Sequence, residues 1–499
     1  MSNSRRPKVT TTVNLPAETQ LDFSWLKRKP SECEVGVDID FYKLFYALKS
    51  NFSCSYFFES LELPRHQDRY FTTGFDPLVQ FIARGNQLTI RGDAESIQRI
   101  TGQQGTPIEK GSCEVIVDLE GQSENPYEYL KRQIPLERLG RTHQGGLIGY
   151  FCYESVNYFE PAIKLEEHAD YPTFHLGLYT DGLILDNETG ICHYYTYHED
   201  RMDQVRPLLD GLDDISIPTR LDSVKVLGNS ETREEHTTAI NNTLDEVKAG
   251  NTFQAEVGFK TLYKIQGDKI AVYDRLRQIN PSPYMFYVVF DDVELMGASP
   301  EILIANTGPA VLTTPTAGTT GRSEDPDEDR RLARALLTDA KEIAEHNMLV
   351  DLHRNDLSRV CRIGTVRIAS LMYLIRFSHV QHIVSDVVGE LSADQTAYDL
   401  LAAILPGGVV SGAPKIETMK IIDRNENTPR GPYGGAVGRF SFNGDSTFCL
   451  PIRSLFCKGD ECFTQTCSGV VLDSNAENEY RELTRKLAAM QQTLQELSQ

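Results

Sequence analysis

PGGVVSGAPKIETMKIIDRNENTPRGPYGGAVGRF, residues 406–440, is the stretch of sequence that decides how this chain folds and what it does. Two loops rich in glycine and proline lie on either side of one short run with helical spacing. So much Gly and Pro leaves few side chains for a packed core, and we expect these loops to bring backbone close to another group. The pattern indicates that this group is a small anionic ligand.

The composition is that of a globular protein of 499 residues with a formal net charge of −21. A chain of this length can bury a large core and is expected to form two large units. The negative charge disfavours nucleic acid and anionic membranes as partners, because both require a basic surface. An anionic substrate would therefore need a local cationic pocket or a metal ion.

The N-terminal sequence has no apolar segment typical of a signal peptide, and no later run is long enough to span a membrane. We therefore expect a cytoplasmic protein. The ten cysteines include Cys457, Cys462 and Cys467 at equal spacing. No histidine completes a zinc site with them, so reduced thiols on a hairpin are expected.

The organisation along the chain changes near residue 225. Residues 35–198 alternate short apolar runs with turn residues, which predicts antiparallel strands with intervening helices. Residues 208–232 are polar and turn-rich, so we divide the chain into an N-terminal region, 1–225, and a C-terminal region, 226–499. In the second region we predict helices at 233–249 and 326–352, the latter as one or two helices, and strands at 253–265 and 284–290.

The last helix has the clearest pattern of all. Asn475 can cap its N-terminus, and one apolar stripe must face the core, formed by Tyr480, Leu483, Leu487, Met490, Leu494 and Leu497.

Carboxylates occur in pairs on two of the predicted helices. Glu479 and Glu482 lie one turn apart beside the apolar stripe of the last helix, with Lys486 one turn further on. Glu342 and Glu345 repeat this spacing on another helix. Two interpretations stay open: solvated helix faces with a Glu482–Lys486 ion pair, or a Mg²⁺ site, since Mg²⁺ binds a few carboxylates and leaves room for substrate oxygens.

Four further positions are candidates for chemistry. Glu301 follows a predicted strand, and partial burial would make its carboxyl a general acid. Gly318 lies in the turn TTPTAGTT, whose amides suit an oxyanion, although a simple polar turn fits as well. His382 lies in an apolar run, where a structural histidine is the alternative. Arg453 lies in the apolar run LPIRSLF and needs a carboxylate from the protein or from a ligand.

Taken together, the motifs PGGxxSGAPK, RGPYGGAVG, AGT, SPE, the KExxEH helix and the final ExxE helix resemble the chorismate-utilising enzymes. Within that family the resemblance is to the large subunits (component I) of anthranilate synthases, and it covers nearly the whole chain. It implies an α+β fold in which extended antiparallel sheets pack as a sandwich flanked by helices. It also implies conversion of chorismate and ammonia to anthranilate and pyruvate, in tryptophan biosynthesis.

The resemblance assigns a metal end to the implied site. Glu345 and Glu482 would bind Mg²⁺, supported by Glu342 and Glu479, and the ion would bind the ring carboxylate of chorismate. Lys486 would add positive charge near that carboxylate.

The other end of the implied site holds the enolpyruvyl carboxylate and the reacting ring. The residues implied to hold that carboxylate are Tyr433, Arg453, Cys467, Ser468 and Gly469. Gly318 and Thr319 would line the ring. Glu301 would protonate the departing C4 hydroxyl while ammonia attacks C2, and His382 would assist the later elimination of pyruvate.

Two positions distinguish branches of this family. Relatives that add water to the ring carry a Lys base where this chain has Gln254, and ammonia needs no such base. Relatives that form a covalent lysine adduct carry Lys where this chain has Ala317. Both residues point to attack by ammonia.

The resemblance also implies a feedback site for tryptophan and a partner. Segments similar to YFFESLE and NPSPYMF form an inhibitor pocket in anthranilate synthases, which makes Ser60, Pro283, Tyr284 and Met285 the candidate inhibitor-binding residues. No cysteine lies in a nucleophile elbow, so ammonia is expected from a separate glutamine amidotransferase subunit (component II) or from solution.

Three departures from the family pattern bear on the product. The family usually has Thr at Val409, Gly-Ala-Gly at 467–469 and Arg-Pro at 320–321. These changes affect the half of the reaction that releases pyruvate. Two alternatives therefore stay open: an enzyme that stops at 2-amino-2-deoxyisochorismate, and a sensor of chorismate or tryptophan without activity.

Overall fold

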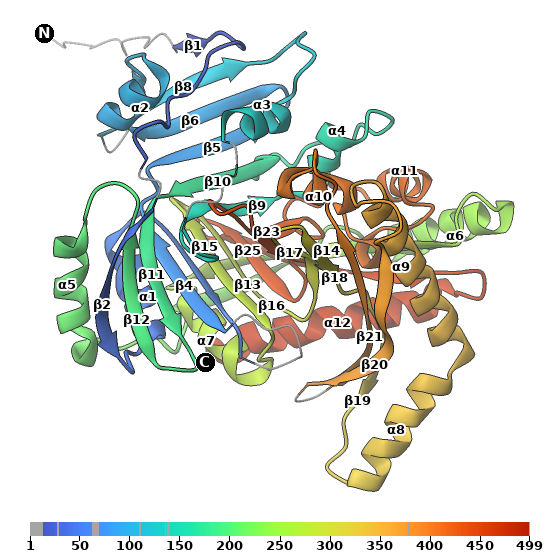
Figure 1. Ribbon diagram of the computed structural model, residues 1–499. Coiled ribbons are helices and arrows are strands. Elements are labelled where there is room, and N and C mark those ends of the chain that lie inside the picture. The colour runs from blue at the N-terminus through green and yellow to red at the C-terminus, as the bar shows by residue number, and fades with distance from the viewer. Residues whose placement is uncertain are drawn as a thin grey trace, which may run out of the picture.

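The computed structural model describes residues 13–26, 29–61, 69–108, 111–134, 136, 140–377 and 380–498. Two large sheets pack face to face, and helices cover their outer faces (Figure 1). The predicted α+β sandwich of antiparallel sheets flanked by helices is confirmed, with one parallel pair, β1 with β8, in the described residues.

The first sheet has 14 strands in the described part of the chain. In spatial order they are β1 (Asn14–Leu15), β8 (Ser112–Asp118), β6 (Gln87–Asp93), β5 (Val79–Arg84), β10 (Phe174–Tyr179), β9 (Gly146–Phe151), β23 (Ala436–Ser441), β24 (Ser446–Cys449), β17 (Ile302–Thr307), β18 (Ala310–Thr313), β21 (Val380–Glu390) and β19 (Thr316–Gly321), with β20 (Arg367–Arg376) beside β21 and β7 (Thr106–Pro107) beside β8.

The second sheet has 12 strands in the same described ranges. Their spatial order is β13 (Ser223–Asn229), β14 (Gln254–Gln266), β26 (Glu461–Val470), β25 (Ser454–Lys458), β16 (Val293–Ser299), β15 (Tyr284–Phe290), β3 (Cys54–Glu59), β4 (Tyr70–Phe75), β11 (Asp181–Asp186), β12 (Ile191–Thr196) and β2 (Ser31–Val37), with β22 (Gly412–Ala413) beside β14.

Three apolar clusters explain why the layers hold together. Aromatic and aliphatic side chains from both sheets, such as Tyr56 and Tyr150, fill the space between them. The outer face of the first sheet packs against α2 (Ala94–Thr101), α3 (Pro126–Gln133) and α10 (Ala397–Ile404). The outer face of the second sheet packs against α1 (Phe41–Asn51), α5 (Met202–Asp210), α7 (Ile270–Ile279) and α12 (Ala476–Leu497).

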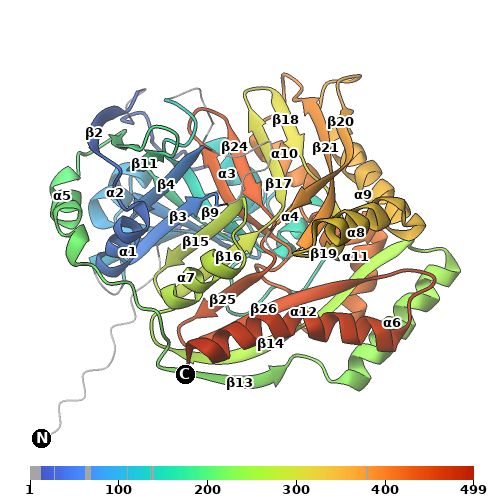
Figure 2. The same cartoon turned by 90° about the horizontal axis from the view of Figure 1, so that it is seen from below.

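The two predicted regions share both sheets. Strands of the N-terminal region form one end of each sheet, and strands β13 to β26 form the other (Figure 2). The boundary at residues 225 and 226 therefore does not separate two independent cores. The division of labour between the regions stays a prediction.

The predicted elements of the C-terminal region form as expected. Helix α6 (Arg233–Ala249) begins with a capping box made by Thr232 and Glu235. Residues 326–352 form two helices, α8 (Pro326–Thr338) and α9 (Ala340–Ser358), because Asp339 ends the first and caps the second. Helix α12 is capped by Asn475. The predicted stripe is buried from Leu483 to Leu497, and Tyr480 is partly buried.

The Gly-dense loops approach backbone closely, as expected. At two positions the neighbouring backbone belongs to a strand of this protein and not to a ligand. Gly412 has φ 136°, and a Cβ there would lie 2.0 Å from the carbonyl oxygen of Gln254. A Cβ at Gly435 would lie 1.9 Å from the carbonyl oxygen of Phe151. At these positions glycine is required for packing against a strand.

Cysteine pairing differs from the prediction of reduced thiols. Cys457 and Cys462 lie directly opposite each other in β25 and β26 and form a disulfide. Cys467 is a free, buried thiol. None of the helices in the described ranges combines the length and apolar character that a membrane-spanning helix needs.

Candidate functional site

Helices α9 and α12 bring the predicted carboxylates to one part of the molecule. Burial and the negative charges of Glu345 and Glu482 raise the pKa of Glu342. Glu482 Oε1 forms an ion pair with Lys486 Nζ at 2.8 Å. Burial acts to raise the pKa of Glu482, but the charge and hydrogen bond of Lys486 outweigh it, and the pKa is lowered. The Glu482–Lys486 ion pair of the first interpretation forms, and the Mg²⁺ site stays a prediction. Glu479 is buried at the start of the same helix.

Strand β14 adds two polar residues to this cluster. The side-chain amide of Gln254 donates one hydrogen bond to Glu256 Oε1 at 2.8 Å and another to Glu345 Oε1 at 2.9 Å. Burial raises the pKa of Glu256 to about 7, against the opposing effect of Lys486. Lys486 also donates to the carbonyl oxygen of Cys467 at 3.0 Å.

A Mg²⁺ ion fits the chemistry of this donor set but has few protein ligands. Within the residues that the structure describes, no three His, Cys, Asp or Glu side chains form a ready ligand set. Crowding of Glu342, Glu345 and Glu482 nevertheless leaves negative charge that a cation would relieve. Mg²⁺ commonly binds one or two carboxylates and completes its shell with water and substrate oxygens.

His382 and Arg453 form a second polar group of the site. Arg453 Nη2 is 2.9 Å from His382 Nε2. A guanidinium can only donate, so Nε2 accepts and the ring hydrogen lies on Nδ1, 2.9 Å from Thr319 Oγ1. Burial and the nearby Arg453 lower the pKa of His382 to about 3, so the imidazole is neutral at neutral pH.

Among the described residues no carboxylate forms an ion pair with Arg453, although the charge of Glu301 acts on it. Its side chain contacts His382 and the side-chain oxygen of Asn280, at 3.5 Å. Burial lowers the pKa of Arg453 to about 10, which Glu301 only partly opposes. The predicted need of this guanidinium for a carboxylate is thus not met within the described chain.

Glu301 has the surroundings expected of a general acid. It follows β16 and is 2% exposed. Burial raises the pKa of its carboxyl well above the usual value, while the Thr316 backbone and the Arg453 charge act in the opposite direction. A carboxyl that stays protonated near neutral pH can donate a proton. Gly318 lies in the adjoining β19, where a Cβ would be 2.9 Å from Glu342 Oε2.

Side chains occupy the part of the site where the resemblance places the enolpyruvyl carboxylate. The Tyr433 hydroxyl donates to Cys467 Sγ at 3.1 Å, and both residues are buried. Val409 packs against the same apolar cluster. Ser468 is buried as well, whereas Gly469 lies against the Gln254 amide. Whether Tyr433, Cys467 and Ser468 contact a ligand stays a prediction.

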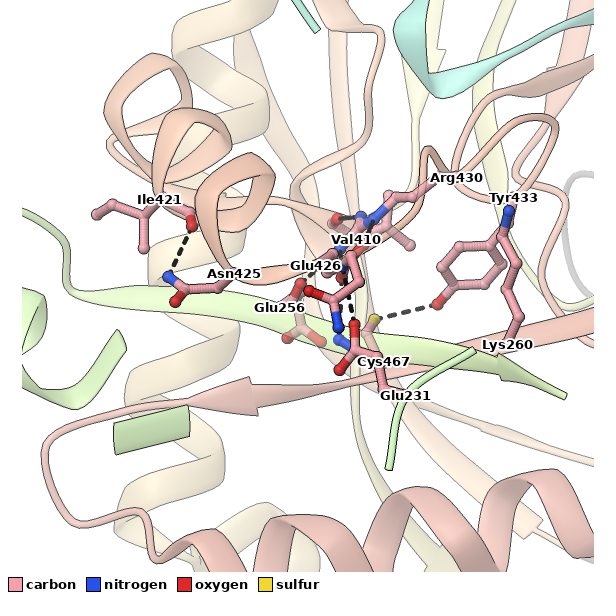
Figure 3. A network of polar contacts seen from close by, with 12 residues as sticks. Glu231, Glu256, Lys260, Val410, Ile421, Asn425, Glu426, Arg430, Tyr433 and Cys467 are labelled. Carbon is pink, nitrogen blue, oxygen red and sulfur yellow. Dashed lines mark hydrogen bonds and ion pairs between the residues drawn. The ribbon is translucent and has the colours of Figure 1, made fainter. Parts of the chain in front are cut away.

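Arg430 joins both Gly-dense loops to strand β14 (Figure 3). Its guanidinium donates to the backbone oxygens of Val410 and Glu256 at 2.5 and 2.6 Å, and to the Glu426 carboxylate at 2.6 Å. Glu426 also accepts from the amide of Gly258 at 2.9 Å. Arg430 is 2% exposed, so these contacts replace its entire solvation.

The four predicted inhibitor-binding residues are brought together away from the carboxylates. Ser60, at the end of β3, and Pro283–Met285, at the start of β15, line one cavity. The other lining residues are Phe58, Glu59, Tyr70, Phe286, Val437, Gly438, Arg439, Thr447 and Cys449. Glu59 is held by Arg277, at 2.7 Å, and by the Tyr273 hydroxyl, at 3.0 Å.

Sequence reasoning missed two residues of this site. Glu256 is a charged residue within the buried strand run QAEVGF, and that contrast was a usable signal. Arg430 lies inside the motif RGPYGG, and a charged residue between two Gly-dense loops was a usable signal as well. Both are charged residues that lie buried, and a buried charge needs a partner in the protein or in a ligand.

A sequence model of the chorismate binding enzymes matches residues 82–492, which include the carboxylates of α9 and α12, Glu301, His382 and Arg453. A solved structure, that of anthranilate synthase component I from Streptococcus pneumoniae, superposes with a TM-score of 0.69 at 26% identity, over 87% of this chain and 94% of that one. The menaquinone-specific isochorismate synthase of Escherichia coli shares the fold, with a TM-score of 0.67 at 17% identity over 93% of this chain and 94% of that one. The fold and the site are those of a chorismate-binding enzyme.

Curated relatives narrow this class. Anthranilate synthase component 1 of Leptospira biflexa is 40% identical over 458 residues, which cover 91% of this chain and 94% of that protein. The same component of Methanothermobacter thermautotrophicus is 36% identical over 454 residues, covering 91% of this chain and 92% of that protein. The chain belongs to the anthranilate synthase component 1 family of chorismate-binding enzymes.

Arg430→Ala is expected to lower the free energy of unfolding by about 3–5 kcal/mol, because Glu426 would be left buried without its counter-charge. Denaturant unfolding of the purified chain measures this. Arg424→Ala is the control, since Arg424 is an exposed residue whose ion pair with Glu246 spans 3.1 Å, and it should cost less than about 1 kcal/mol. Equal losses in the two variants would contradict the role given to Arg430.

Proposed function

We propose that this chain is the chorismate-converting subunit of an anthranilate synthase. It takes chorismate and ammonia and releases anthranilate and pyruvate, in tryptophan biosynthesis. Its relatives named anthranilate synthase component 1, at 36–40% identity over 91% of the chain, support this activity. That name also favours a component II partner, a glutamine amidotransferase that supplies ammonia.

One observation carries the proposal within the site itself. Arg453 is a partly buried guanidinium that forms no ion pair with a carboxylate among the described residues, and it lies beside a neutral His382. A charge that is partly withdrawn from water without a counter-charge is costly, so this position is suited to a carboxylate that arrives with a ligand. Chorismate carries two carboxylates, and the enolpyruvyl carboxylate is the one that Arg453 would bind.

The remaining residues suit the proposed reaction in turn. Glu301, whose pKa burial raises, would give a proton to the departing C4 hydroxyl, which leaves as water. Ammonia would form the new bond to C2 in the same step. His382, neutral and fixed by Thr319, would assist the elimination of pyruvate that makes the ring aromatic, once Arg453 turns to the substrate carboxylate and frees the lone pair of Nε2.

Mg²⁺ is the proposed cofactor, with Glu345 and Glu482 as its ligands and Glu342 and Glu479 as support. The ion would place positive charge against the ring carboxylate of chorismate. The repulsion that Glu342 experiences from Glu345 and Glu482 supports a cation at this position. Lys486, paired with Glu482, would contribute charge to the same end of the substrate.

The product decides between the proposed activity and its alternatives. We expect the purified chain, incubated with chorismate, Mg²⁺ and an ammonium salt, to form anthranilate and pyruvate in equal amounts, measured by chromatography with mass detection. Accumulation of 2-amino-2-deoxyisochorismate without pyruvate would contradict this and favour the truncated reaction to which Val409 and Cys467 point. Unchanged chorismate would favour a sensor.

Glu345→Gln should weaken Mg²⁺ binding by at least about tenfold, because a neutral amide replaces a charged ligand. Titration calorimetry with Mg²⁺ in the presence of chorismate, and without ammonia, measures the affinity independently of turnover. Asp351→Asn is the matched control, since Asp351 lies on the same helix in an exposed pair with Arg354. Unchanged Mg²⁺ affinity in Glu345→Gln would show that the metal assignment is wrong.

Feedback inhibition by tryptophan is a second proposal, at the cavity lined by β3 and β15 of one sheet and by β23 and β24 of the other. Its walls are aromatic or apolar at Tyr70, Tyr284, Met285 and Phe286, which suits an indole ring. The cavity also adjoins the active site, since Asn280 precedes Pro283 by three residues and contacts Arg453. A ligand that moves this segment would therefore act on Arg453.

Ser60→Phe should raise the tryptophan concentration for half inhibition at least about tenfold, because the larger side chain occupies the cavity. Activity without tryptophan should change less than about twofold, since Ser60 lies outside the catalytic residues. Ser60→Ala keeps the cavity open and should retain inhibition. If Ser60→Phe is inhibited as strongly as the unaltered chain, tryptophan binds elsewhere or not at all.

A further inference from the structure

Glu154 is a buried carboxylate that has no part in the proposed reaction. It lies in η2 (Tyr153–Ser155), which follows β9 in the N-terminal region, and it is 2% exposed. Its side chain contacts the loop before β23, residues 429–435. This loop carries Arg430 and Tyr433 (Figure 3). A charged residue of the N-terminal region is thus buried against a loop of the predicted chorismate site.

The Glu154 carboxylate accepts hydrogen bonds from two successive backbone amides of this loop. The amide of Arg430 donates to Oε1 at 2.7 Å, and the amide of Gly431 donates to Oε1 at 3.1 Å and to Oε2 at 3.2 Å. Successive N–H groups that converge on one anion form a nest, and Gly431 has the left-handed φ of 67° that such a turn requires. In return, the amide of Tyr153 donates to the carbonyl oxygen of Gly431 at 2.8 Å. The nest, residues 430 and 431, is therefore fixed to η2 through its backbone.

Lys260 holds the residue that precedes the nest. It lies on β14 and is 3% exposed, and its ammonium group donates to the carbonyl oxygen of Pro429. Burial raises the pKa of Glu154, while the hydrogen bonds from the loop and the charge of Lys260 act in the opposite direction. Two buried groups of opposite charge therefore hold three successive residues of the loop by backbone atoms.

Tyr433 lies between two fixed points of the loop. On one side the nest is bound to Glu154, and only Pro432 separates the nest from Tyr433. On the other side lies Gly435, where a Cβ would be 1.9 Å from the carbonyl oxygen of Phe151. With the loop fixed so closely on both sides, a displacement of the nest would displace Tyr433.

We propose that Glu154 is a positioning residue, which holds the loop so that Tyr433 meets the enolpyruvyl carboxylate of chorismate. This inference rests on the proposed function and on the assignment of Tyr433 to that carboxylate. Glu154 contacts no reacting atom in this scheme and acts through the backbone of the loop. Without its oxygens, two buried amides would lack an acceptor, which is costly, and the loop would move to satisfy them. The effect should fall on chorismate binding, because Glu301 and His382 lie on other elements.

The test measures initial rates while chorismate is varied at saturating ammonium and Mg²⁺. Glu154→Met fills a similar volume without an acceptor, and it should raise the KM for chorismate about tenfold or more, with kcat changed less than about threefold. Glu154→Gln keeps an acceptor oxygen for both amides, so its KM should stay within about threefold of the unaltered chain. If Glu154→Met does not fold, Lys260→Met carries the test. It removes the donor to Pro429 and should raise the KM for chorismate about threefold or more.

The control is Asp181→Asn on β11, since Asp181 is an equally buried carboxylate that accepts from Tyr194 at 2.8 Å and from Arg201 Nε at 2.9 Å. A chain that is merely destabilised contains fewer active sites, so its kcat falls and its KM for chorismate is kept, as we expect of this control. The same result in Glu154→Met would overturn this inference alone. Equal rises of the KM in Glu154→Met and Glu154→Gln would also overturn it, because the lost charge and not the lost acceptor would then be responsible. If the unaltered chain does not consume chorismate, the proposed function fails together with it.

Discussion

The buried guanidinium of Arg430 is the interaction on which the site depends. It connects the carbonyl oxygen of Val410 in one Gly-dense loop, the carbonyl oxygen of Glu256 in β14 and the carboxylate of Glu426. The loop that carries Arg430 also carries Tyr433. A guanidinium that is buried away from water is stable only while all of these hydrogen bonds are formed. The contacts of Arg430 therefore hold the two loops and β14 in one arrangement.

This arrangement gives the site two ends of opposite character. At one end, α9 and α12 gather carboxylates that need a cation, and Gln254 fixes Glu345 through a hydrogen bond from β14. At the other end, Arg453 is a cation without a carboxylate ion pair in the described chain. A ligand with two carboxylates, bound through a metal ion at one end and directly at the other, satisfies both. The net charge of −21 had required such local compensation.

Much of the fold could be predicted from the sequence because its helices have strong signals. The stripe and cap of α12 and the capping box of α6 are local patterns, and the structure confirms them. The partnership between the two regions could not be predicted, since strand order depends on contacts between distant residues. The Cys457–Cys462 pairing could not be predicted for the same reason, because it depends on the register between β25 and β26. At the site, spacing identified the paired carboxylates, whereas Glu256 became significant only once its neighbours were known.

The central claim is that chorismate lies between the carboxylates of α9 and α12 and the Arg453 guanidinium. A crystal structure of the chain with Mn²⁺ and chorismate, without ammonia, tests it most directly, because the anomalous signal locates the metal and the ligand density shows both carboxylates. The account predicts Mn²⁺ on Glu345 and Glu482 and the enolpyruvyl carboxylate on Arg453. A metal bound elsewhere, or an Arg453 that contacts no ligand carboxylate, would contradict it.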